Sequence, residues 1–413
     1  MVDLDLDAIG DPTDAVQVLI DGTPITIYED YDVQMSVLQQ PAAFTLRLGW
    51  SDVARDLLNL AAPGREFELR VKGVVIQSGR IDGRRLRSGE SGTFVEVKGR
   101  DWMAALYDSF VKEERSFADA TYEKLTRTVL DLCGLKEPRH GLLVSDLART
   151  KAIAGFQTIK VVNEETIKEI ETGAAVTTQT KVVNKTLKAK LGERWYDWLQ
   201  RQFKLKGLFL WCTGEGNFVL SEPEWDQEPA FTILRARGTD PGHEYSTVLD
   251  VDWNDDTTHR HSRVTVHGRG GGGAAGRAKV KGVHDDADML ERGIVKELVV
   301  HDEDCKTPEQ CAFVARRTSA EERRAGWTLE YTLSGHTVPS IKGGGDAIWG
   351  PNLVARVSDD EIPLDGTFWI ERVGFSRKPH TTTNITLMRP GDLVFGSPEK
   401  ANRAPKPKRH PKL

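Results

Sequence analysis

The pattern of apolar and polar positions changes its period near residue 100. An apolar run at residues 94–97 is typical of a strand, and from Trp102 to Leu106 apolar residues recur at helical spacing. Gly99 interrupts the run, and the Asp101 carboxylate can cap a helix by accepting backbone N–H bonds. We therefore predict a strand that ends in a tight turn, then a short helix. Trp102 is expected to anchor the core of the strand-rich region before it.

Short apolar runs separated by turn residues precede this change. Asp21-Gly22 lies between the first two runs and predicts a hairpin turn. The predicted strands are residues 16–20, 24–28, 33–38, 44–48, 67–71, 74–81 and 94–97. Residues 51–60 instead have apolar positions at helical spacing, which indicates a short helix across one face. This succession predicts an antiparallel β-barrel or sandwich.

A mixed pattern follows. One helix is predicted at residues 118–132, with Gly134 as its C-cap, and another at residues 193–203, where tryptophans form an apolar stripe. A hairpin is predicted directly afterwards, at residues 207–220. Residues 161–188 are rich in threonine, valine and lysine and have no clear period, so no element is predicted there.

Strand patterns return from Phe231 onward. The predicted strands are residues 248–252, 263–267, 294–300, 327–333, 349–357, 367–375 and 384–388, with a helix at residues 307–326. A glycine-rich run at residues 268–277 predicts a flexible loop. It is not a phosphate-binding loop, because no Gly-Lys-Ser/Thr sequence follows and no helix begins there.

The fold class that these patterns predict is α+β, mainly β. The predicted parts are a first barrel-like domain at residues 1–108, a mixed α/β middle domain at 109–229, a second barrel-like domain at 230–398 and a basic, proline-rich tail at 399–413. Two interpretations of the tail stay open: a solvated extension, or a segment that is ordered only against a partner.

Composition narrows the class of protein. A chain of 413 residues, 39% apolar and 29% charged, is an ordinary globular protein with about two or three domains. No apolar run approaches the roughly 20 residues of a membrane span. The acidic N-terminus lacks a signal-peptide pattern, so we expect cytoplasmic synthesis and no membrane insertion. The net charge of −6 disfavours a broad nucleic-acid-binding surface but is compatible with a wall past which nucleic acid slides.

Few side chains are candidates for chemistry. His259, His261 and His267 lie close together, but no acidic or cysteine partner has a suitable spacing, and the four cysteines fit no zinc pattern. Arg100-Asp101 is interpreted as a helix cap and a surface ion pair. Acidic clusters that could supply a glycosidase pair are Asp255-Asp256, Asp285-Asp286 and Asp359-Asp360-Glu361. Their polar surroundings would not raise a carboxyl pKa, as an acid catalyst requires, so we predict no catalytic, cofactor-binding or metal-binding residue.

Three segments, in order along the chain, resemble the Mu-like phage tail proteins that form the hub of a contractile-tail baseplate. The first is the strand-turn-helix of residues 92–108. The second comprises Leu191-Gly192-Glu193, Trp195, Trp198, Gly207-Leu208-Phe209-Leu210-Trp211, Gly214-Glu215-Gly216 and Val219-Leu220. The third follows a helix with paired arginines and comprises the strand Trp327 to Leu333, Trp349-Gly350-Pro351-Asn352-Leu353-Val354, Ile370 to Phe375 and Thr386 to Pro390.

The resemblance implies a structural protein of the virion that has no cofactor and is assembled in the host bacterial cytoplasm. It implies a homotrimer in which each chain contributes two tube-like antiparallel β-barrels. Such a ring would join the hexameric tail tube to the trimeric central spike and leave a channel for DNA. The implied partners are the tail tube, central spike, other baseplate proteins and the tape measure protein. The particle is either a bacteriophage or a genome-free contractile injection device.

Two alternative classes of function stand beside this one. A tail-tip enzyme, a peptidoglycan hydrolase that helps to penetrate the cell envelope, is the alternative interpretation. An isolated nucleic-acid-binding module is disfavoured by the negative net charge.

Overall fold

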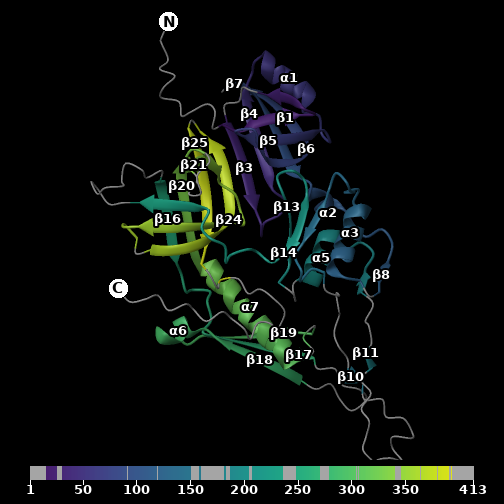
Figure 1. The fold of residues 1–413 in the computed structure, drawn as a ribbon, viewed down its shortest axis with the longest axis vertical. Helices are drawn as coiled ribbons and strands as arrows, with labels where there is room; N and C mark the ends of the chain where they lie inside the picture. Colours follow the sequence, from purple (N-terminus) through teal and green to yellow (C-terminus); the bar gives the residue numbers. More distant parts are fainter. Residues whose placement is uncertain are drawn as a thin grey trace, which may run out of the picture.

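The computed structural model of this chain is dominated by β-strands (Figure 1). It describes residues 15–25, 30–90, 92–118, 120–149, 158–159, 181–182, 187–203, 207–235, 248–269, 279–303, 305, 307–339, 346–362, 364–378, 380–389 and 392. Within these ranges, no helix is long and apolar enough to span a membrane. The predicted fold class, mainly β with additional helices, is confirmed.

The first strand-rich region contains strands β1 to β7 and one helix. These are β1 (Gln17–Ile20), β2 (Thr23–Ile25), β3 (Asp30–Ser36), β4 (Ala43–Gly49), α1 (Asp52–Leu60), β5 (Glu66–Val71), β6 (Val74–Gly89) and β7 (Gly92–Asp101). Asp21 and Gly22 form the predicted hairpin turn, with positive φ angles of 46° and 80°. The predicted helix is also confirmed, and the Ser51 side chain caps it by accepting a hydrogen bond from the Ala54 N–H (3.1 Å).

The prediction that Gly99 ends the strand is wrong, because β7 continues through it to Asp101. A Cβ atom at this position would lie 2.8 Å from the ring of Phe67 and closer still to the ring of Phe44. These two rings pack with centroids 4.4 Å apart. Glycine is therefore present in the strand because it makes room for an aromatic pair in the core.

The second strand-rich region continues the same sheet. Its strands are β15 (Phe231–Arg235), β16 (Val248–Asp255), β20 (Trp327–Ser334), β23 (Val354–Asp359), β24 (Leu364–Arg377) and β25 (Thr381–Met388), with the ribbon β21 (Thr337–Pro339) and β22 (Asp346–Ile348). β24 pairs antiparallel with β3, from Arg372 opposite Ser36 to Arg377 opposite Tyr31.

This pairing gives a 13-stranded sheet within the described residues. Its main path runs β16-β20-β25-β24-β3-β4-β7-β6-β5-β1-β2. The sequence patterns did not predict that the two strand-rich regions share one sheet. Closure of each region into a barrel stays a prediction.

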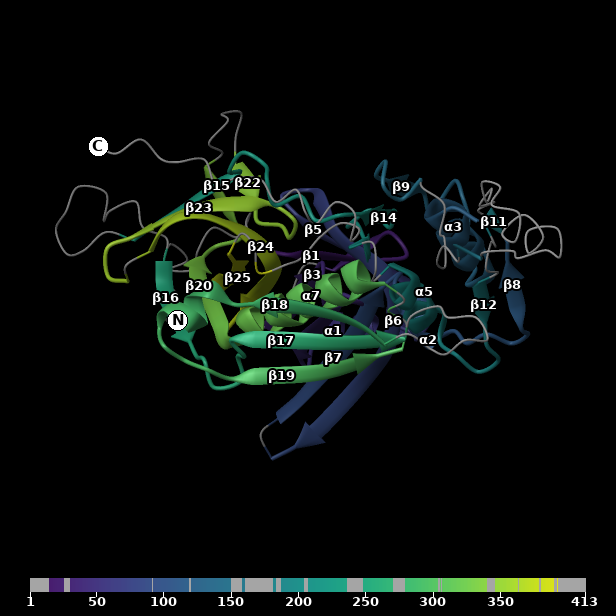
Figure 2. The same ribbon diagram turned by 90° about the horizontal axis from the view of Figure 1, so that it is seen from below.

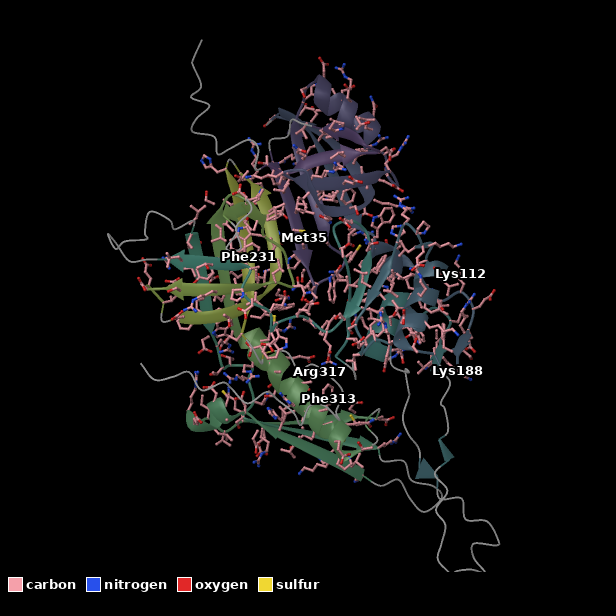
Figure 3. The ribbon with its side chains drawn as sticks, in the orientation of Figure 1. Met35, Lys112, Lys188, Phe231, Phe313 and Arg317 are labelled. Atoms are coloured by element: carbon pink, nitrogen blue, oxygen red, sulfur yellow. The ribbon has the colours of Figure 1, made fainter. Side chains whose placement is uncertain are left out.

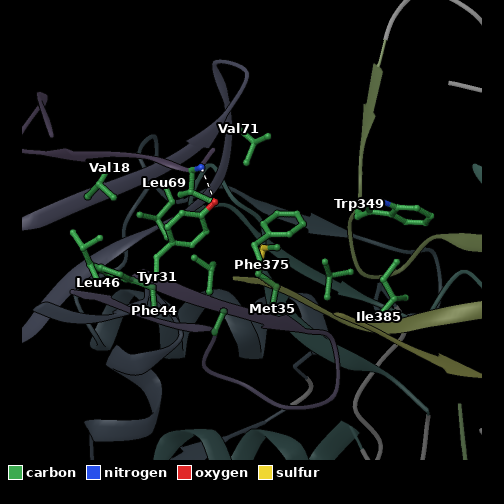
Figure 4. Close-up of a cluster of buried hydrophobic side chains, with 14 of the residues drawn as sticks. Val18, Tyr31, Met35, Phe44, Leu46, Leu69, Val71, Trp349, Phe375 and Ile385 are labelled. Atoms are coloured by element: carbon green, nitrogen blue, oxygen red, sulfur yellow. Dashed lines mark hydrogen bonds between the residues drawn. The ribbon is translucent and has the colours of Figure 1, made fainter. Parts of the chain in front are cut away.

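One hydrophobic core runs across the join between β3 and β24. Figure 4 shows Tyr31 and Met35 of β3 close to Phe375 of β24, with Ile385 further along. The Tyr31 hydroxyl also hydrogen-bonds to His336 Nε2 (2.7 Å). Burial lowers the pKa of His336 to about 4, so this histidine is neutral at neutral pH. The two regions therefore pack as one unit.

The middle of the chain folds around a separate core. Its elements are α2 (Ala104–Asp108), β8 (Arg115–Phe117), α3 (Tyr122–Leu132), β9 (Leu142–Val144), β10 (Thr158–Ile159), β11 (Lys181–Val182), β12 (Leu187–Ala189), α5 (Trp195–Phe203), β13 (Phe209–Cys212) and β14 (Phe218–Ser221). Both predicted helices and the predicted hairpin are confirmed, and Gly134 follows α3 with a φ of 82°. Most of the aperiodic stretch at residues 161–188 lies outside the described residues.

Trp102 is buried, but it packs in this middle core and not in that of the first region. That part of the prediction is wrong. Because β7 ends at Asp101, the chain has already left the first sheet when it reaches Trp102.

A third core lies within the predicted second barrel domain. Its elements are β17 (Arg263–Arg269), β18 (Lys279–Asp285), α6 (Ala287–Glu291), β19 (Glu297–Asp302) and α7 (Pro308–Gly326). α7 covers one face of this small sheet and buries Phe313 against Val264 and Val266 (Figure 3). β18 and α6 were not predicted, and most of the glycine-rich run lies outside the described residues. The predicted domain boundaries at residues 108, 229 and 398 stay predictions.

Phe375→Ala is expected to destabilise both strand-rich regions together. Phe375 is fully buried at the join, and a Phe→Ala change in a core costs roughly 3–5 kcal/mol. Thermal unfolding followed by circular dichroism should show a clearly lower Tm. Phe110→Ala is the matched control, because Phe110 is 46% exposed and its truncation should change the Tm little. Equal shifts for the two variants would contradict the shared core.

Candidate assembly site

His259, His261 and His267, which are close together in the sequence, do not form one site. His261 Nδ1 lies 2.8 Å from Glu322 Oε1, whereas the His267 ring stacks on that of His301 with centroids 5.5 Å apart. His259 is exposed at a turn. Across the described ranges, no three His, Cys, Asp or Glu side chains are grouped as metal ligands would be. The histidines therefore serve separate contacts.

The predicted acidic clusters are held by basic and hydroxyl groups. Although burial opposes ionisation, hydrogen bonds from Arg260 (Nε–Oδ2, 2.9 Å) keep the pKa of Asp286 below its usual value. The Arg263 guanidinium lowers the pKa of Asp285 in the same way. Asp359 accepts a hydrogen bond from the Tyr331 hydroxyl (2.8 Å). A glycosidase acid needs a raised pKa, so Asp285 and Asp286 are unsuited to that role.

Sequence reasoning missed a buried carboxyl group, that of Asp101. Its side chain accepts the Met103 N–H (3.0 Å) just before α2, but the helix has no side-chain cap, so the predicted helix cap is not formed. The predicted ion pair with Arg100 is wrong, because Arg100 binds Asp82 and Asp108 instead (2.6 and 2.7 Å). Neighbouring strand residues point to opposite faces, and this places Asp101 inside, where burial raises its pKa to about 7.

Asp101 borders a cavity of about 310 Å³ between the two strand-rich regions and the middle unit. Gln77 also lines the cavity and is only 2% exposed. Beside it, the turn between β13 and β14 docks on β6 so closely that a Cβ at Gly214 would lie 2.5 Å from the Val75 carbonyl oxygen. The Trp102 indole N–H donates to Ser78 Oγ (3.3 Å) at the same contact. These contacts fix the middle unit against the first region.

Asn352 makes the corresponding connection to the second region. Its side-chain oxygen accepts hydrogen bonds from the Glu224 N–H (3.0 Å) and from the Trp369 indole N–H (3.2 Å). The Asn352 backbone has a positive φ of 65°, a conformation that asparagine tolerates better than most residues. The segment that leaves the middle unit is therefore held to β24.

Several strand edges of the shared sheet have no partner strand among the described residues: those of β2, β15, β16 and the far part of β6, of which the last two are the longest. β16 pairs with β20 alone. β6 pairs with β5 only as far as Arg80, so residues 83–89 pair with β7 alone. Figure 2 shows this part of β6 and β7 projecting from the body as a hairpin. We call residues 83–89 the β6 edge and residues 248–255 the β16 edge.

Both edges carry exposed apolar and charged side chains. Leu86 on the β6 edge is 48% exposed, and Trp253 on the β16 edge is 38% exposed. Arg84 on the β6 edge donates to the Leu58 carbonyl oxygen, and Asp255 on the β16 edge pairs with Arg292. The other exposed charged residues are Arg85 and Arg87 on the β6 edge and Asp250 and Asp252 on the β16 edge. None of these four has an ion pair within the part of the chain that the structure describes. Unpaired edges of this kind are ready to bind another strand, so they are the candidate assembly site.

The chain is similar to several known tail proteins. No protein-family model matches the chain. The sequence is 22% identical, over 365 residues, to the baseplate hub protein gp44 of Escherichia phage Mu, covering 86% of this chain and 82% of that protein. The tail protein of Neisseria meningitidis MC58 aligns with a TM-score of 0.68 and 20% identity, covering 92% of this chain and 97% of that structure. The 43 kDa tail protein of prophage MuSo2 from Shewanella oneidensis aligns with a TM-score of 0.68 and 17% identity, covering 92% of this chain and 99% of that structure.

The chain therefore has the fold of phage tail proteins. The similarity extends over most of the sequence and is not confined to one region. Within that class, the chain resembles the Mu-like baseplate hub proteins. The resemblance expected from the three sequence segments is thus confirmed.

Asp101→Asn is expected to change how stability depends on pH. The carboxyl of Asp101 keeps its proton up to about pH 7 in the folded chain but loses it near 3.8 when unfolded. The folded state then binds more protons between these values, so this carboxyl makes stability fall as pH rises from 4 to 7. Asparagine stays neutral at every pH. The difference in Tm, variant minus unmodified chain, should therefore increase from pH 4 to pH 7.

Asp108→Asn is the control for this experiment. Asp108 also lies beside Arg100, but its side chain is 60% exposed. Its replacement should shift the Tm by a similar amount at every pH between about 5 and 8. An Asp101→Asn profile parallel to that of the unmodified chain would show that the Asp101 carboxyl is already ionised when folded.

Proposed function

We propose that this protein is the structural baseplate hub of a phage-like contractile tail. Three chains form a ring that joins the hexameric tail tube to the trimeric central spike. The observation that carries the proposal is the pairing of β3 with β24, which builds two strand-rich regions of one chain into a single sheet. The similarity to a baseplate hub protein over most of the chain supports the same role.

A trimer of this chain would match both symmetries. Each chain supplies two strand-rich regions, so three chains supply six, which matches the six-fold symmetry of the tail tube. The three chains as whole subunits match the three-fold symmetry of the spike. Such a ring uses head-to-tail contacts that close on themselves. The shared core keeps the two regions of each chain at a fixed spacing, as a continuous ring requires.

One face of the sheet suits the wall of a channel for DNA. A row across this face, from β16 to β4, reads Asp250, Thr332, Asn384, Gly374, Gln34 and Ala43. These six side chains are small, neutral or acidic, so this part of the face would not hold the phosphate backbone as lysine and arginine do. The row continues with Arg100 on β7, which is paired with Asp82 and Asp108, and with Arg80 on β6. DNA, and the tape measure protein before it, would then pass without binding.

The proposed partners are a tail tube protein, a central spike protein and other baseplate proteins. The protein would reach the virion by assembly with them in the host cytoplasm. The docking of the middle unit supports this, because the Trp102 and Asn352 contacts hold it against the two strand-rich regions in one arrangement on which rigid partners can dock.

Native mass spectrometry of the purified chain, alone and with tube and spike proteins, tests the oligomeric state. The expected species has three times the 46.0 kDa mass of the chain. Negative-stain images of it should show a ring with six similar lobes. A chain that stays monomeric with both partners present would overturn the proposal.

We also propose that the chain has no enzymatic activity. The lowered pKa values of Asp285 and Asp286 argue against these two carboxyl groups as the acid of a tail-tip hydrolase. Zymography against peptidoglycan should show no clearing. A clearing zone that disappears on substitution of a single carboxylate would establish the hydrolase instead.

A further inference from the structure

We propose that the cavity beside Asp101 binds a calcium ion, held by the Asp101 carboxylate and by the side-chain amide oxygens of Gln77 and Gln40. The cavity, of about 310 Å³, is bordered by residues of both strand-rich regions and of the middle unit. Met35, which Figure 3 labels, also lines it. The site lies within one chain and does not depend on the proposed ring.

The charges around the cavity favour a cation. Two acidic residues line it, the buried Asp101 and the exposed Glu224, and the described lining residues include no lysine, arginine or histidine. The neighbouring Arg100 binds Asp82 and Asp108 instead (2.6 and 2.7 Å). Asp101 therefore has no ion pair within the described part of the chain. Buried carboxylates are normally paired with a cation or bound to a metal.

Two glutamine side chains on the lining have amide atoms without hydrogen-bond partners in the described chain. Gln77 is 2% exposed, and neither atom of its amide is hydrogen-bonded. The Gln40 amide nitrogen donates to the Ser36 carbonyl oxygen, but its amide oxygen has no partner, although the residue is only 8% exposed. Buried polar groups are rarely left unpaired. Two buried amide oxygens are thus available to a cation.

The register of β6 and β7 brings these oxygens to one place. Asp101 lies opposite Gly79, and Gln77 is two residues before Gly79 on the same face of β6. Because Gly79 has no side chain, the space over it is left to Asp101 and Gln77. Gln40 reaches the same cavity from the connection between β3 and β4. Ligands this scattered have no spacing pattern, so the sequence alone predicts no metal site.

The ligand chemistry selects calcium among the common cations. Carboxylate and amide oxygens are usual ligands of Ca²⁺, which accepts about six to eight oxygens, water included, in a flexible geometry, whereas Mg²⁺ requires a near-ideal octahedron. The Cys212 thiol also lines the cavity, but it donates to the Thr213 carbonyl oxygen (3.4 Å). Burial keeps the pKa of this thiol well above its usual value, so the thiolate that zinc would bind is not formed.

A bound ion would hold together the units that meet at the cavity. Asp101 and Gln77 belong to the first region, Thr213 to the turn that docks the middle unit, and Asn352 to the segment held to β24. An ion that binds only this folded arrangement stabilises it by mass action. The Tm of the chain should therefore rise with the concentration of CaCl2.

Terbium luminescence tests the site in the full chain. Tb³⁺ binds oxygen ligands as Ca²⁺ does, and a nearby indole, here that of Trp211 on the lining, sensitises its emission. Titration at about pH 8, where the Asp101 carboxyl has lost its proton, should give saturable emission. Ca²⁺ should displace Tb³⁺, and Mg²⁺ should do so only at higher concentrations.

Two variants remove ligands from the site. Asp101→Asn removes the negative charge and Gln77→Met removes an amide oxygen, so each should weaken Tb³⁺ and Ca²⁺ binding by about tenfold or more. Without calcium, Gln77→Met should keep the Tm of the unmodified chain or exceed it, because no hydrogen bond of this amide is lost. A loss of binding with an intact fold distinguishes a ligand from a structural residue.

Asp108→Asn is the matched control. It removes one carboxylate from an exposed position beside Arg100 that does not line the cavity, so binding should be unchanged.

Three results would overturn the proposal. Equal binding by all three variants would place the cation elsewhere. A chain that shows no sensitised emission, and no change in Tm with millimolar CaCl2, would have no calcium site. Displacement of Tb³⁺ at lower concentrations of Mg²⁺ than of Ca²⁺ would contradict the assignment to calcium. The trimeric hub is tested separately, by native mass spectrometry, and none of these results bears on it.

Discussion

The structure depends on the antiparallel pairing of β3 with β24. This contact joins residues near the start of the chain to residues near its end, with Tyr31, Val33 and Met35 packed in the core shared with Val373 and Phe375. Contacts this distant in sequence incur a large loss of chain entropy, which the continuous apolar core offsets. Because the core crosses the join, neither strand-rich region has a complete interior alone. The fixed geometry of the molecule, and any ring built from it, follows from this pairing.

Much of the secondary structure could be predicted from the sequence, because most strands alternate and most helices bury a periodic stripe. The errors have local physical causes. Gly99 suggested a break, yet it stands within a strand to admit the rings of Phe44 and Phe67. β18 was missed because lysines on its open face and Gly282 under α7 leave few apolar residues in its pattern. The pairing of β3 with β24 has no local signal, since periodicity specifies which face is buried but not which strand is the neighbour.

The candidate site was less predictable than the fold. The acidic and histidine clusters are conspicuous in the sequence, but they proved to be partners of nearby basic groups, hydroxyls and rings. The Asp101 carboxyl looked like half of a surface ion pair, and only the alternation of side chains along β7 shows that it points inward. The charges of Arg85 and Asp250 resembled ordinary solvated residues. That they belong to the candidate assembly site can be recognised only in the structure, where the sheet places them on two open edges.

The long separation of β3 and β24 also has a consequence for synthesis on the ribosome. Ser36 and Arg372 are 336 positions apart, so β3 leaves the ribosome roughly 20–70 s before its partner strand at ordinary translation rates. During that interval its edge is open to any other nascent chain. Asp30, Asp32 and Gln34 point away from the core along this strand, and polar or charged residues on an edge discourage unwanted pairing. The polar face of β3 thus discourages unwanted pairing of the nascent chain, before the same face becomes part of the completed sheet.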